Sequence, residues 1–255
     1  MKINVLFKRV DAAYLEKNYD SVINMLHPAR REKVAKLKNK KAAYVSMTAG
    51  LLLQEVVERE FGLKPEDILI GRGENGKPYL KEYPEYQYNI SHSGDMVMMA
   101  YSRQELGVDI EELRVKDTKV AKRCFGSDEY LYVLNGSNDR DGSASAGYGE
   151  DALNIEMLPT DEAEEVLPEK EIADKAGEDN KKAERSRRFF EIWTLKEAYL
   201  KLTGKGISVP LSSFEVDVEN KCVKNEALKY YTGEVDNYIY AICAEDVSEV
   251  RIENF

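Results

Sequence analysis

Tryptophan, histidine and cysteine are scarce in this chain of 255 residues, which holds one, two and three of them. The cysteines are widely spaced and odd in number, so the sequence predicts neither a cysteine metal motif nor a disulfide framework. We therefore expect a cytoplasmic protein from a reducing compartment. No apolar run of about 18 residues is present, which argues against a membrane span. The N-terminal MKINVLFKRV is too short and too charged for a signal peptide.

Charge is unevenly distributed along the chain. The formal net charge is −10, and residues 135–187 supply most of it, with 15 acidic and 7 basic side chains. Residues 30–41, RREKVAKLKNKK, have the opposite balance, with seven basic side chains and one acidic. A basic patch of this kind suits phosphates, an acidic protein or nucleic acid, and a solvated helical face is the alternative. The apolar share of 43% indicates a globular protein.

The predicted elements follow a similar order twice, which suggests two α+β halves at residues 1–106 and 107–255. Each half is expected to hold a strand, a helix and a small sheet in similar proportion. Residues from about 135 to 186 are rich in Gly, Ser, Asn and Asp and then in charged side chains. We interpret them as a flexible acidic insertion on the surface, without a catalytic role.

Periodicity places the individual elements. INVLFKRV predicts a first strand, and helices are expected over residues 12–26 and, as one helix or two, over 28–61 with Gly62 as the C-cap. YQYNIS, MVMMAYS and LGVDIEEL alternate like three strands of one antiparallel sheet. Helix is also expected over residues 119–134, and strand-like runs follow the tryptophan.

The segment RRFFEIWTLKEAYLKLTGKG, residues 187–206, predicts a largely buried helix, because apolar residues cover most of its circumference. Glu197, Lys201 and Thr194 share the remaining arc, since residues four apart are neighbours on a helix. Two interpretations fit this strip. It is either a solvated Glu–Lys pair contributing about 0.3–0.5 kcal/mol, or a charged strip that lines a cleft.

GVDIEEL places Asp109 and Glu111 two residues apart in a strand, so both carboxylates face the same side. Two such carboxylates repel each other unless a cation neutralises them. With Glu197 they make three oxygen ligands of the kind that Mg²⁺ prefers. A solvent-facing edge strand is the plainer alternative. In YNISHSGD, His92 lies between two serines after a strand, a position suited to a phosphate, although a lone histidine is usually structural.

YNISHS, GVDIEE and WTLKEAYLK occur in the order found in 4′-phosphopantetheinyl transferases. The chain resembles the large, monomeric, Sfp-type class with a W…KEA signature, and PARREK, GKP and LTGKGISVPLSSFEV fit as well. The similarity covers nearly the whole chain except residues 135–186. It implies an α+β fold of two similar halves, each a small antiparallel sheet with a long helix packed on it, and an active site in the cleft between them. It also implies transfer of 4′-phosphopantetheine from coenzyme A to a serine of an acyl or peptidyl carrier protein, releasing adenosine 3′,5′-bisphosphate.

The resemblance further assigns roles to residues. Asp109, Glu111 and Glu197 would hold Mg²⁺, with Mn²⁺ as the alternative ion. Glu197 would also accept the serine proton, and Lys201 would stabilise the leaving phosphate; His92 completes the expected catalytic set. A larger group is expected to bind coenzyme A: Arg30, Lys33, Ser46, Lys77, Ser91, His92, Lys196 and Lys201. Glu129 aligns with a family acid whose role stays open.

The expected partners are coenzyme A and a carrier protein of fatty-acid, polyketide or nonribosomal-peptide synthesis. We expect a monomer that binds neither nucleic acid nor membranes. Two alternatives from other classes remain open. One is a non-catalytic module that binds carrier proteins or coenzyme A, which would need a broken set of acids. The other is a nucleic-acid binder that uses residues 30–41, for which binding would depend steeply on salt.

Overall fold

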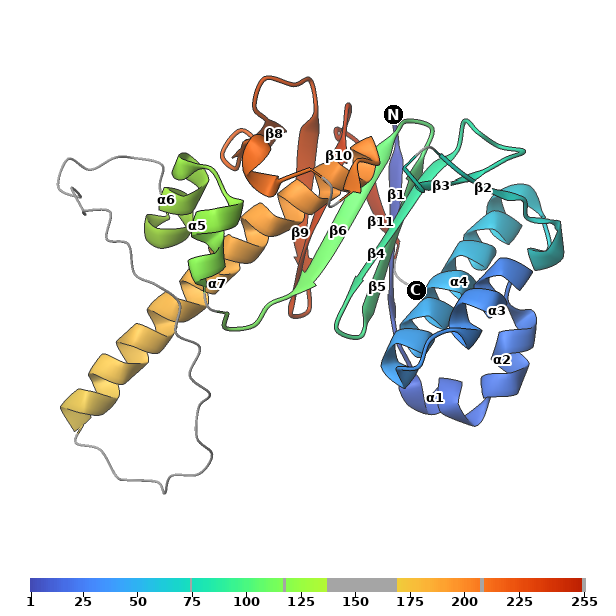
Figure 1. Cartoon of the computed structure of the whole chain (residues 1–255), viewed down its shortest axis with the longest axis horizontal. Helices are drawn as coiled ribbons and strands as arrows, with labels where there is room; N and C mark the ends of the chain where they lie inside the picture. The colour runs from blue at the N-terminus through green and yellow to red at the C-terminus, as the bar shows by residue number, and fades with distance from the viewer. Residues whose placement is uncertain (74, 117, 137–168, 207–208, 254–255) are drawn as a thin grey trace.

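The computed structural model describes residues 1–73, 75–116, 118–136, 169–206 and 209–253. Two sheets form the centre of the molecule, and helices pack on both (Figure 1). This arrangement confirms the expected combination of small sheets and packed helices. No helix within the described ranges has the length and apolar character needed to cross a membrane. Much of the expected insertion, residues 137–168, lies outside the described residues.

The first sheet has the strand order β11–β1–β5–β4. Its strands are β1 (Ile3–Arg9), β4 (Gln87–Ser93), β5 (Met96–Ser102) and β11 (Val250–Glu253). β5 pairs antiparallel with β1 and β4, whereas β11 pairs parallel with β1. The expectation of a purely antiparallel sheet is therefore wrong here, because the last strand of the chain returns to pair with the outer edge of β1.

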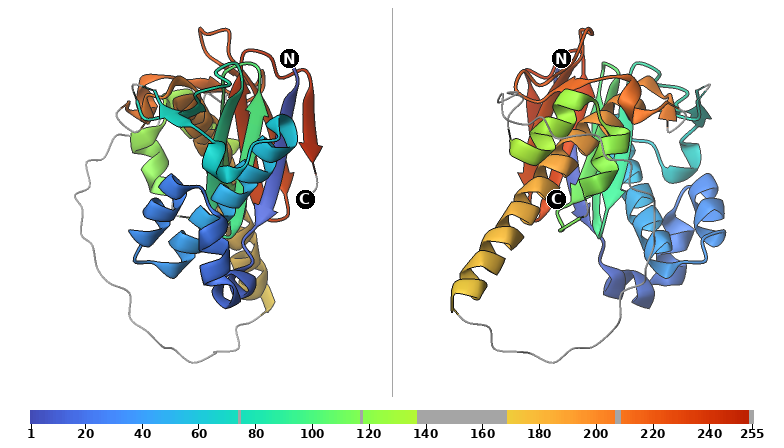
Figure 2. Two further views of the ribbon diagram at one scale, coloured as in Figure 1. Left: turned by 90° about the vertical axis from the view of Figure 1, so that its right-hand side faces the viewer. Right: turned by 60° about the vertical axis from the view of Figure 1, so that its left-hand side comes forward.

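Helices α1 to α4 form a layer on one side of the first sheet (Figure 2). They span α1 (Ala12–Lys17), α2 (Tyr19–Met25), α3 (Pro28–Ala35) and α4 (Lys40–Phe61). The Asn39 side chain caps α4 by accepting from the amide of Ala42, so the region from residue 28 holds two helices. Gly62 ends α4 with a φ of 67°, which confirms the predicted C-cap. The short helix η1 (Pro65–Asp67) and the hairpin of β2 (Ile70–Arg72) and β3 (Pro78–Leu80) follow.

The second sheet has the strand order β6–β10–β9–β8–β7. Its strands are β6 (Leu106–Glu112), β7 (Val216–Asp217), β8 (Cys222–Val223), β9 (Lys229–Val235) and β10 (Tyr238–Ala244). β10 pairs antiparallel with both β6 and β9. The prediction that β6 continues the sheet of β4 and β5 is therefore wrong. Its ladder partner comes from the far end of the chain, which local alternation cannot reveal.

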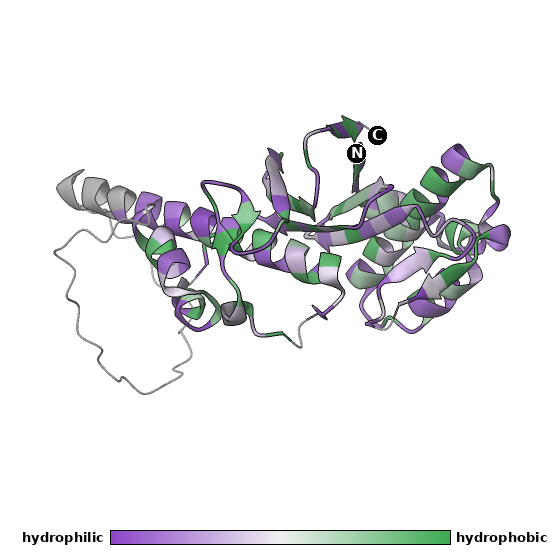
Figure 3. Cartoon of the chain, turned by 90° about the horizontal axis from the view of Figure 1, so that it is seen from above, coloured by the Kyte–Doolittle hydropathy of each residue, from purple (hydrophilic) through white to green (hydrophobic). Residues whose placement is uncertain are grey.

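Helix α7 (Glu169–Thr203) lies along β6 and β10. It begins within the expected insertion, and its first part projects beyond the sheets (Figure 1). Residues 178–185 are exposed, whereas most residues from Phe189 onward are buried, a change from hydrophilic to hydrophobic that is visible in Figure 3. The described residues also form η2 (Thr118–Val120), α5 (Ala121–Cys124), α6 (Ser127–Asn135) and η4 (Leu211–Ser213).

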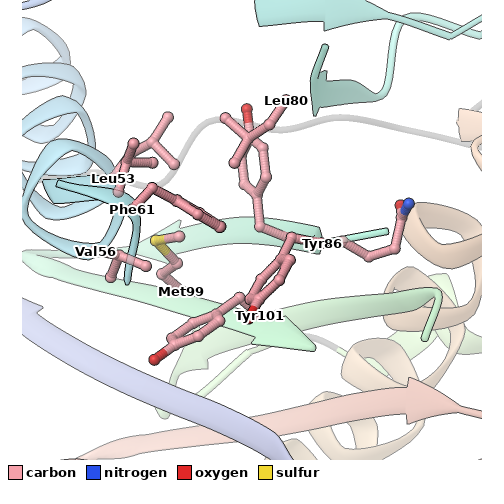
Figure 4. A pocket seen from close by; sticks show the side chains of 10 residues that line it. Leu53, Val56, Phe61, Leu80, Tyr86, Met99 and Tyr101 are labelled. Carbon is pink, nitrogen blue, oxygen red and sulfur yellow. The ribbon is translucent and has the colours of Figure 1, made fainter. Parts of the chain in front are cut away.

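A small apolar cavity of about 10 Å³ lies in the core between α4 and the strands β4 and β5 (Figure 4). Leu53, Val56, Phe61 and Met99 are among the side chains that line it, and no charged residue does. A space of this size holds about one water at most. We therefore regard it as imperfect packing and not as a binding site.

The two sheets meet where β4 runs beside β6. Asn89 Oδ1 accepts from the amide of Val108 at 3.0 Å, and Ser93 Oγ accepts from the amide of Glu112 at 3.1 Å. The paired residue numbers rise together, so the two strands run in the same direction. Side chains of β4 thus fix β6 in register, and several predicted site residues lie on these two strands.

Candidate active site

Ser91, Asp109 and Lys201 form a hydrogen-bonded triangle at the junction of the two sheets. Lys201 Nζ donates to Asp109 Oδ1 at 2.6 Å and to Ser91 Oγ at 2.7 Å. Ser91 Oγ donates to Asp109 Oδ1 at 2.8 Å. Asp109 is only 4% exposed, and its other oxygen, Oδ2, is buried without a hydrogen-bond partner among the described residues. A buried carboxylate oxygen without a hydrogen bond destabilises the folded protein when no ligand is bound. The position of Oδ2 therefore indicates a ligand-binding site.

Glu111, two positions after Asp109 on β6, also accepts a hydrogen bond from a serine of β4. Ser93 Oγ donates to Glu111 Oε2 at 2.8 Å, and both serine–carboxylate pairs are 18 residues apart in sequence. Ser93 was not among the predicted site residues. The signal was present, because the serines and the acids each recur with the period of a strand.

The three carboxylates Asp109, Glu111 and Glu197, called the acid group below, are not fully neutralised. Burial raises the pKa of Asp109, although Lys201 and Ser91 oppose this change. Burial and then the charge of Asp109 raise the pKa of Glu111, and the same two causes raise the pKa of Glu197. Mutual repulsion in a partly buried site is the setting in which a bound cation is most stabilising.

Helix α7 presents Glu197 and Lys201 to this junction. Trp193, Glu197 and Lys201 are half-buried and recur every four residues, whereas most of their neighbours on the helix are buried. Lys201 pairs with Asp109 across the junction, so the interpretation of a solvated Glu–Lys pair is wrong. Thr194 shares this arc of the helix, but it is 1% exposed and donates to the carbonyl of Glu191 at 3.0 Å, so it is not available to a ligand.

A metal ion would find suitable donors in the acid group. Within the part of the chain that the structure describes, no three His, Cys, Asp or Glu side chains already converge as a metal cluster. The chemistry nevertheless suits a hard cation, because all three donors are carboxylates and Asp109 Oδ2 has no hydrogen-bond partner in the described part of the chain. Mg²⁺ commonly binds with few carboxylates and completes its shell with water and phosphate oxygens.

Arg30, Lys33 and Arg72, called the cation group below, lie within electrostatic reach of one another. The surrounding protein and the charge of Arg72 lower the pKa of Arg30. The surrounding protein and then Arg30 and Arg72 lower the pKa of Lys33. Clustered positive charge of this kind favours an anion. Arg72 was missed by the sequence analysis, although a basic residue in the glycine-rich turn GRGENGKP was a usable signal.

His92 connects the cation group with the acid group. The surrounding protein, Lys201 and Lys33 lower the pKa of His92, and Asp109 raises it. The imidazole therefore lies within electrostatic reach of both groups. A ligand with several phosphates would contact cations at one end of this surface and the acid group with Lys201 at the other.

Helix α4 shapes the position of Arg30. A Cβ at Gly50 would lie 2.8 Å from Arg30 Cγ, so glycine makes room for this side chain. Ser46 lies one turn earlier on the same face of α4, and its buried hydroxyl has no hydrogen-bond partner among the described residues. Ser46 therefore offers an unused donor close to the cation group.

The ammonium group of Lys77 connects the β2–β3 hairpin to two other elements. Its Nζ donates to the carbonyls of Leu106 at 3.1 Å and Leu202 at 3.0 Å. It thereby links the end of the β2–β3 hairpin to the start of β6 and the end of α7. Burial lowers the pKa of Lys77. These contacts use two of its three donor hydrogens, so only one remains for a ligand.

Lys196 is not brought to the acid group, although its neighbour in sequence is Glu197. The side chain of Lys196 is 0% exposed and pairs with Glu129 Oε1 at 2.8 Å. Its Nζ also donates to the carbonyls of Leu211 at 2.7 Å and Phe214 at 2.6 Å. The expected contact of Lys196 with a bound cofactor is therefore wrong for this arrangement, because its ammonium is fully enclosed on another side of α7.

Comparisons with known proteins point to one family. Residues 14–104 match the family model described as 4′-phosphopantetheinyl transferase, N-terminal, and residues 150–243 match the 4′-phosphopantetheinyl transferase superfamily. The chain is 27% identical to 4′-phosphopantetheinyl transferase Sfp of Bacillus subtilis (strain 168), over 99% of each protein. It is 29% identical to 4′-phosphopantetheinyl transferase psf-1 of Bacillus pumilus, over 66% of this chain and 54% of that protein. It is 24% identical to 4′-phosphopantetheinyl transferase gsp of Aneurinibacillus migulanus, over 95% of this chain and 86% of that protein.

Proposed function

The chain belongs to the 4′-phosphopantetheinyl transferase superfamily, and on that premise we propose that it transfers 4′-phosphopantetheine from coenzyme A to a carrier-protein serine. The observation that carries the proposal is the acid group around Asp109, whose Oδ2 has no hydrogen-bond partner among the residues that the structure describes, linked through His92 to a separate cation group. Coenzyme A has a pyrophosphate and a 3′-phosphate, so its charges complement these two groups. Acyl and peptidyl carrier proteins are the proposed acceptors.

The proposed reaction breaks a phosphoanhydride bond of coenzyme A and forms a phosphate ester on serine. The serine oxygen forms a bond to the phosphorus next to pantetheine, and the bond from that phosphorus to adenosine 3′,5′-bisphosphate breaks. Glu197 accepts the serine proton, directly or through water; its raised pKa makes it a better base near neutral pH. Mg²⁺ or Mn²⁺, held by Asp109, Glu111 and Glu197, would neutralise charge on the pyrophosphate.

Lys201 is the group that we assign to the leaving phosphate. Its side chain is 30% exposed, whereas that of Asp109 is 6% exposed, so part of the ammonium faces outward. Asp109 and Ser91 orient it through short hydrogen bonds. A lysine ammonium is a compact charge with three donors, which suits a phosphate oxygen on which charge develops.

The 3′-phosphate of coenzyme A is assigned to the cation group. Arg30 and Lys33 would neutralise it, with Arg72 as an additional cation and Ser46 as a neutral donor. His92 would contact the phosphates between the two groups. The support for this assignment is the cluster of cations together with the unused hydroxyl of Ser46.

We also propose that two similar halves, each a sheet with a long helix, form a cleft that holds this site. The packing of α4 on the first sheet and of α7 on the second supports this division. The protein is proposed to act as a cytoplasmic monomer that does not bind nucleic acid. Light scattering after size exclusion would check the monomer, and a dimer would contradict it.

Intact mass spectrometry of an apo carrier protein tests the proposed function. After incubation with this protein, coenzyme A and Mg²⁺, we expect a gain of one phosphopantetheine, which EDTA and Glu197→Ala both abolish. No gain across several carrier types despite coenzyme A binding would favour the non-catalytic module. The absence of both transfer and coenzyme A binding would refute the proposal.

A second experiment tests the assignment of the 3′-phosphate. Arg30→Gln should raise the KM for coenzyme A by about 10-fold or more, the size expected for a lost charged hydrogen bond. Dephospho-coenzyme A lacks the 3′-phosphate, so the variant and the wild type should use it equally well. Lys38→Gln is the matched control, because Lys38 is an exposed cation in the same basic segment. An equal penalty with both substrates would remove Arg30 from this role.

A further inference from the structure

The turn between β4 and β5 directly follows Ser93, the serine that holds Glu111. It is a two-residue loop, because Ser93 pairs with Met96 across the hairpin. Gly94 has a φ of 56°, and a glycine at the first central position with positive φ is typical of a type II′ hairpin turn. A shift of this turn would move Ser93 and with it the hydrogen bond to Glu111 Oε2.

Tyr238, on β10 of the other sheet, fixes this turn. Its hydroxyl donates to Asp95 Oδ1 at 2.5 Å and accepts from the amide of Asp95 at 3.2 Å. A Cβ at Gly94 would lie 2.5 Å from the Tyr238 oxygen and 2.6 Å from Glu112 Oε2. Tyr238 is 3% exposed and stands opposite Glu112 in the register of β6 and β10. One buried hydroxyl therefore ties the second sheet to the turn of the first.

Arg9 completes this network. Its guanidinium donates to both oxygens of Asp95 at 2.7 Å and to Asp236 Oδ2 at 2.7 Å. It also lies 5.9 Å from the centre of the Tyr238 ring. The hydrogen bond from Tyr238 and then those from Arg9 lower the pKa of Asp95, so this carboxylate stays ionised and accepts from both partners. The network thus joins β1, the β4–β5 turn and the β9–β10 turn.

We propose that Tyr238 is a positioning residue for Glu111, an inference that rests on the proposed function. Tyr238 holds the turn, the turn holds Ser93, and Ser93 Oγ donates to Glu111 Oε2. Asp109 repels Glu111, and a glutamate side chain has rotatable bonds along which to move away. The restraint keeps both carboxylates on one side of β6, where a divalent ion requires them together.

Binding of Mn²⁺, measured by electron paramagnetic resonance with saturating coenzyme A, tests this role in Tyr238→Phe. We expect the affinity to fall by about 2- to 10-fold, the size of one lost hydrogen bond. The KM for the metal in the transfer assay should rise by the same factor, whereas kcat at saturating metal and the KM for the carrier should not change. Tyr231→Phe is the matched control, because Tyr231 stacks on Tyr240 in the same sheet, with 6.4 Å between ring centres, and lies outside the network.

A double-mutant cycle with Ser93→Ala separates positioning from a general loss of stability. If Tyr238 acts through Ser93, Tyr238→Phe should cause no further loss of Mn²⁺ affinity in the Ser93→Ala background. Additive losses, or wild-type affinity in Tyr238→Phe alone, would overturn the positioning role. Should Tyr238→Phe not fold, Asp95→Asn tests the same hydrogen bond from its other end.

The wild-type protein distinguishes this inference from the proposed function. Wild-type transfer and Mn²⁺ binding, combined with unchanged affinity in Tyr238→Phe, would overturn the positioning role alone. A wild type that neither transfers phosphopantetheine nor binds Mn²⁺ would overturn the proposed function, and the positioning role with it.

Discussion

Lys196 and Lys201 lie on the same helix and each pairs with a carboxylate, but the two pairs differ in how completely their hydrogen bonds are satisfied. Lys196 and Glu129 have side chains 0% and 2% exposed. Lys196 donates to two backbone carbonyls, and Glu129 accepts from two backbone amides, those of Gly126 and Val216, at 2.7 and 2.8 Å. This pair leaves little capacity for a ligand.

In the pair of Lys201 and Asp109, by contrast, the hydrogen-bonding capacity is not fully used. Asp109 Oδ2 has no partner among the described residues, Lys201 is partly exposed, and two further carboxylates, Glu111 and Glu197, lie within electrostatic reach of Asp109. A buried charged network stabilises a fold when all its members are satisfied and costs free energy when they are not. The comparison therefore assigns the first pair to folding and the second to binding.

Removing Lys196 should give the largest effect on stability. Lys196→Met leaves Glu129 as an unpaired buried charge, and we expect the free energy of unfolding to fall by about 3–5 kcal/mol. Urea unfolding followed by the fluorescence of Trp193 measures this loss. A loss below about 1 kcal/mol would contradict the structural role, because it would match an exposed pair.

The same substitution at Lys201 should reduce catalysis strongly and stability only weakly. Lys201→Met should lower kcat by about 10²- to 10³-fold, as expected when a donor to developing charge is removed. Its stability loss should be less than half that of Lys196→Met, because Asp109 keeps the hydrogen bond from Ser91. Steady-state transfer assays and urea unfolding measure both quantities. Equal stability losses at the two lysines would remove the distinction between the pairs.

The difference between the two lysines could not be predicted from the sequence. Alternation placed Asp109 and Glu111 on one side of a strand, and the helical period brought Glu197 and Lys201 together, because both relations are local. Lys196 lies among apolar residues on a helix that is buried nearly all round, so its direction depends on packing against other elements. Its partner, Glu129, belongs to a different helix.

Contacts between distant parts of the chain account for most of the other predictions from the sequence that were wrong. The predicted cap at Gly62 and the predicted boundaries of most strands depend on a few consecutive residues. By contrast, β6 leaves the sheet of β4, and β11 joins β1, through contacts between distant parts of the chain. The role of Tyr238 depends on the same type of contact, since it acts on a turn 143 residues away in sequence.

The pH dependence of stability gives a smaller test of the same comparison. The pKa of Asp109 is raised on folding, so the folded protein binds more protons than the unfolded chain above about pH 4. Stability should therefore fall as the pH rises through the interval between the unfolded and folded pKa values. In EDTA, Asp109→Asn should gain stability relative to the wild type as the pH rises above about 4, as measured by thermal unfolding. A constant difference across this range would show that Asp109 is already neutralised within the protein.

The exposed ion pair of Lys36 and Glu32 should contribute least to stability and to catalysis. Lys36 Nζ lies 2.6 Å from Glu32 Oε1, as short a contact as that of Lys201 with Asp109, but its side chains are 73% and 69% exposed. Because water solvates both charges and salt screens them, Glu32→Gln should leave the urea midpoint and kcat unchanged. If Glu32→Gln instead destabilised the protein as much as Lys201→Met, distance and not burial would decide what these pairs contribute.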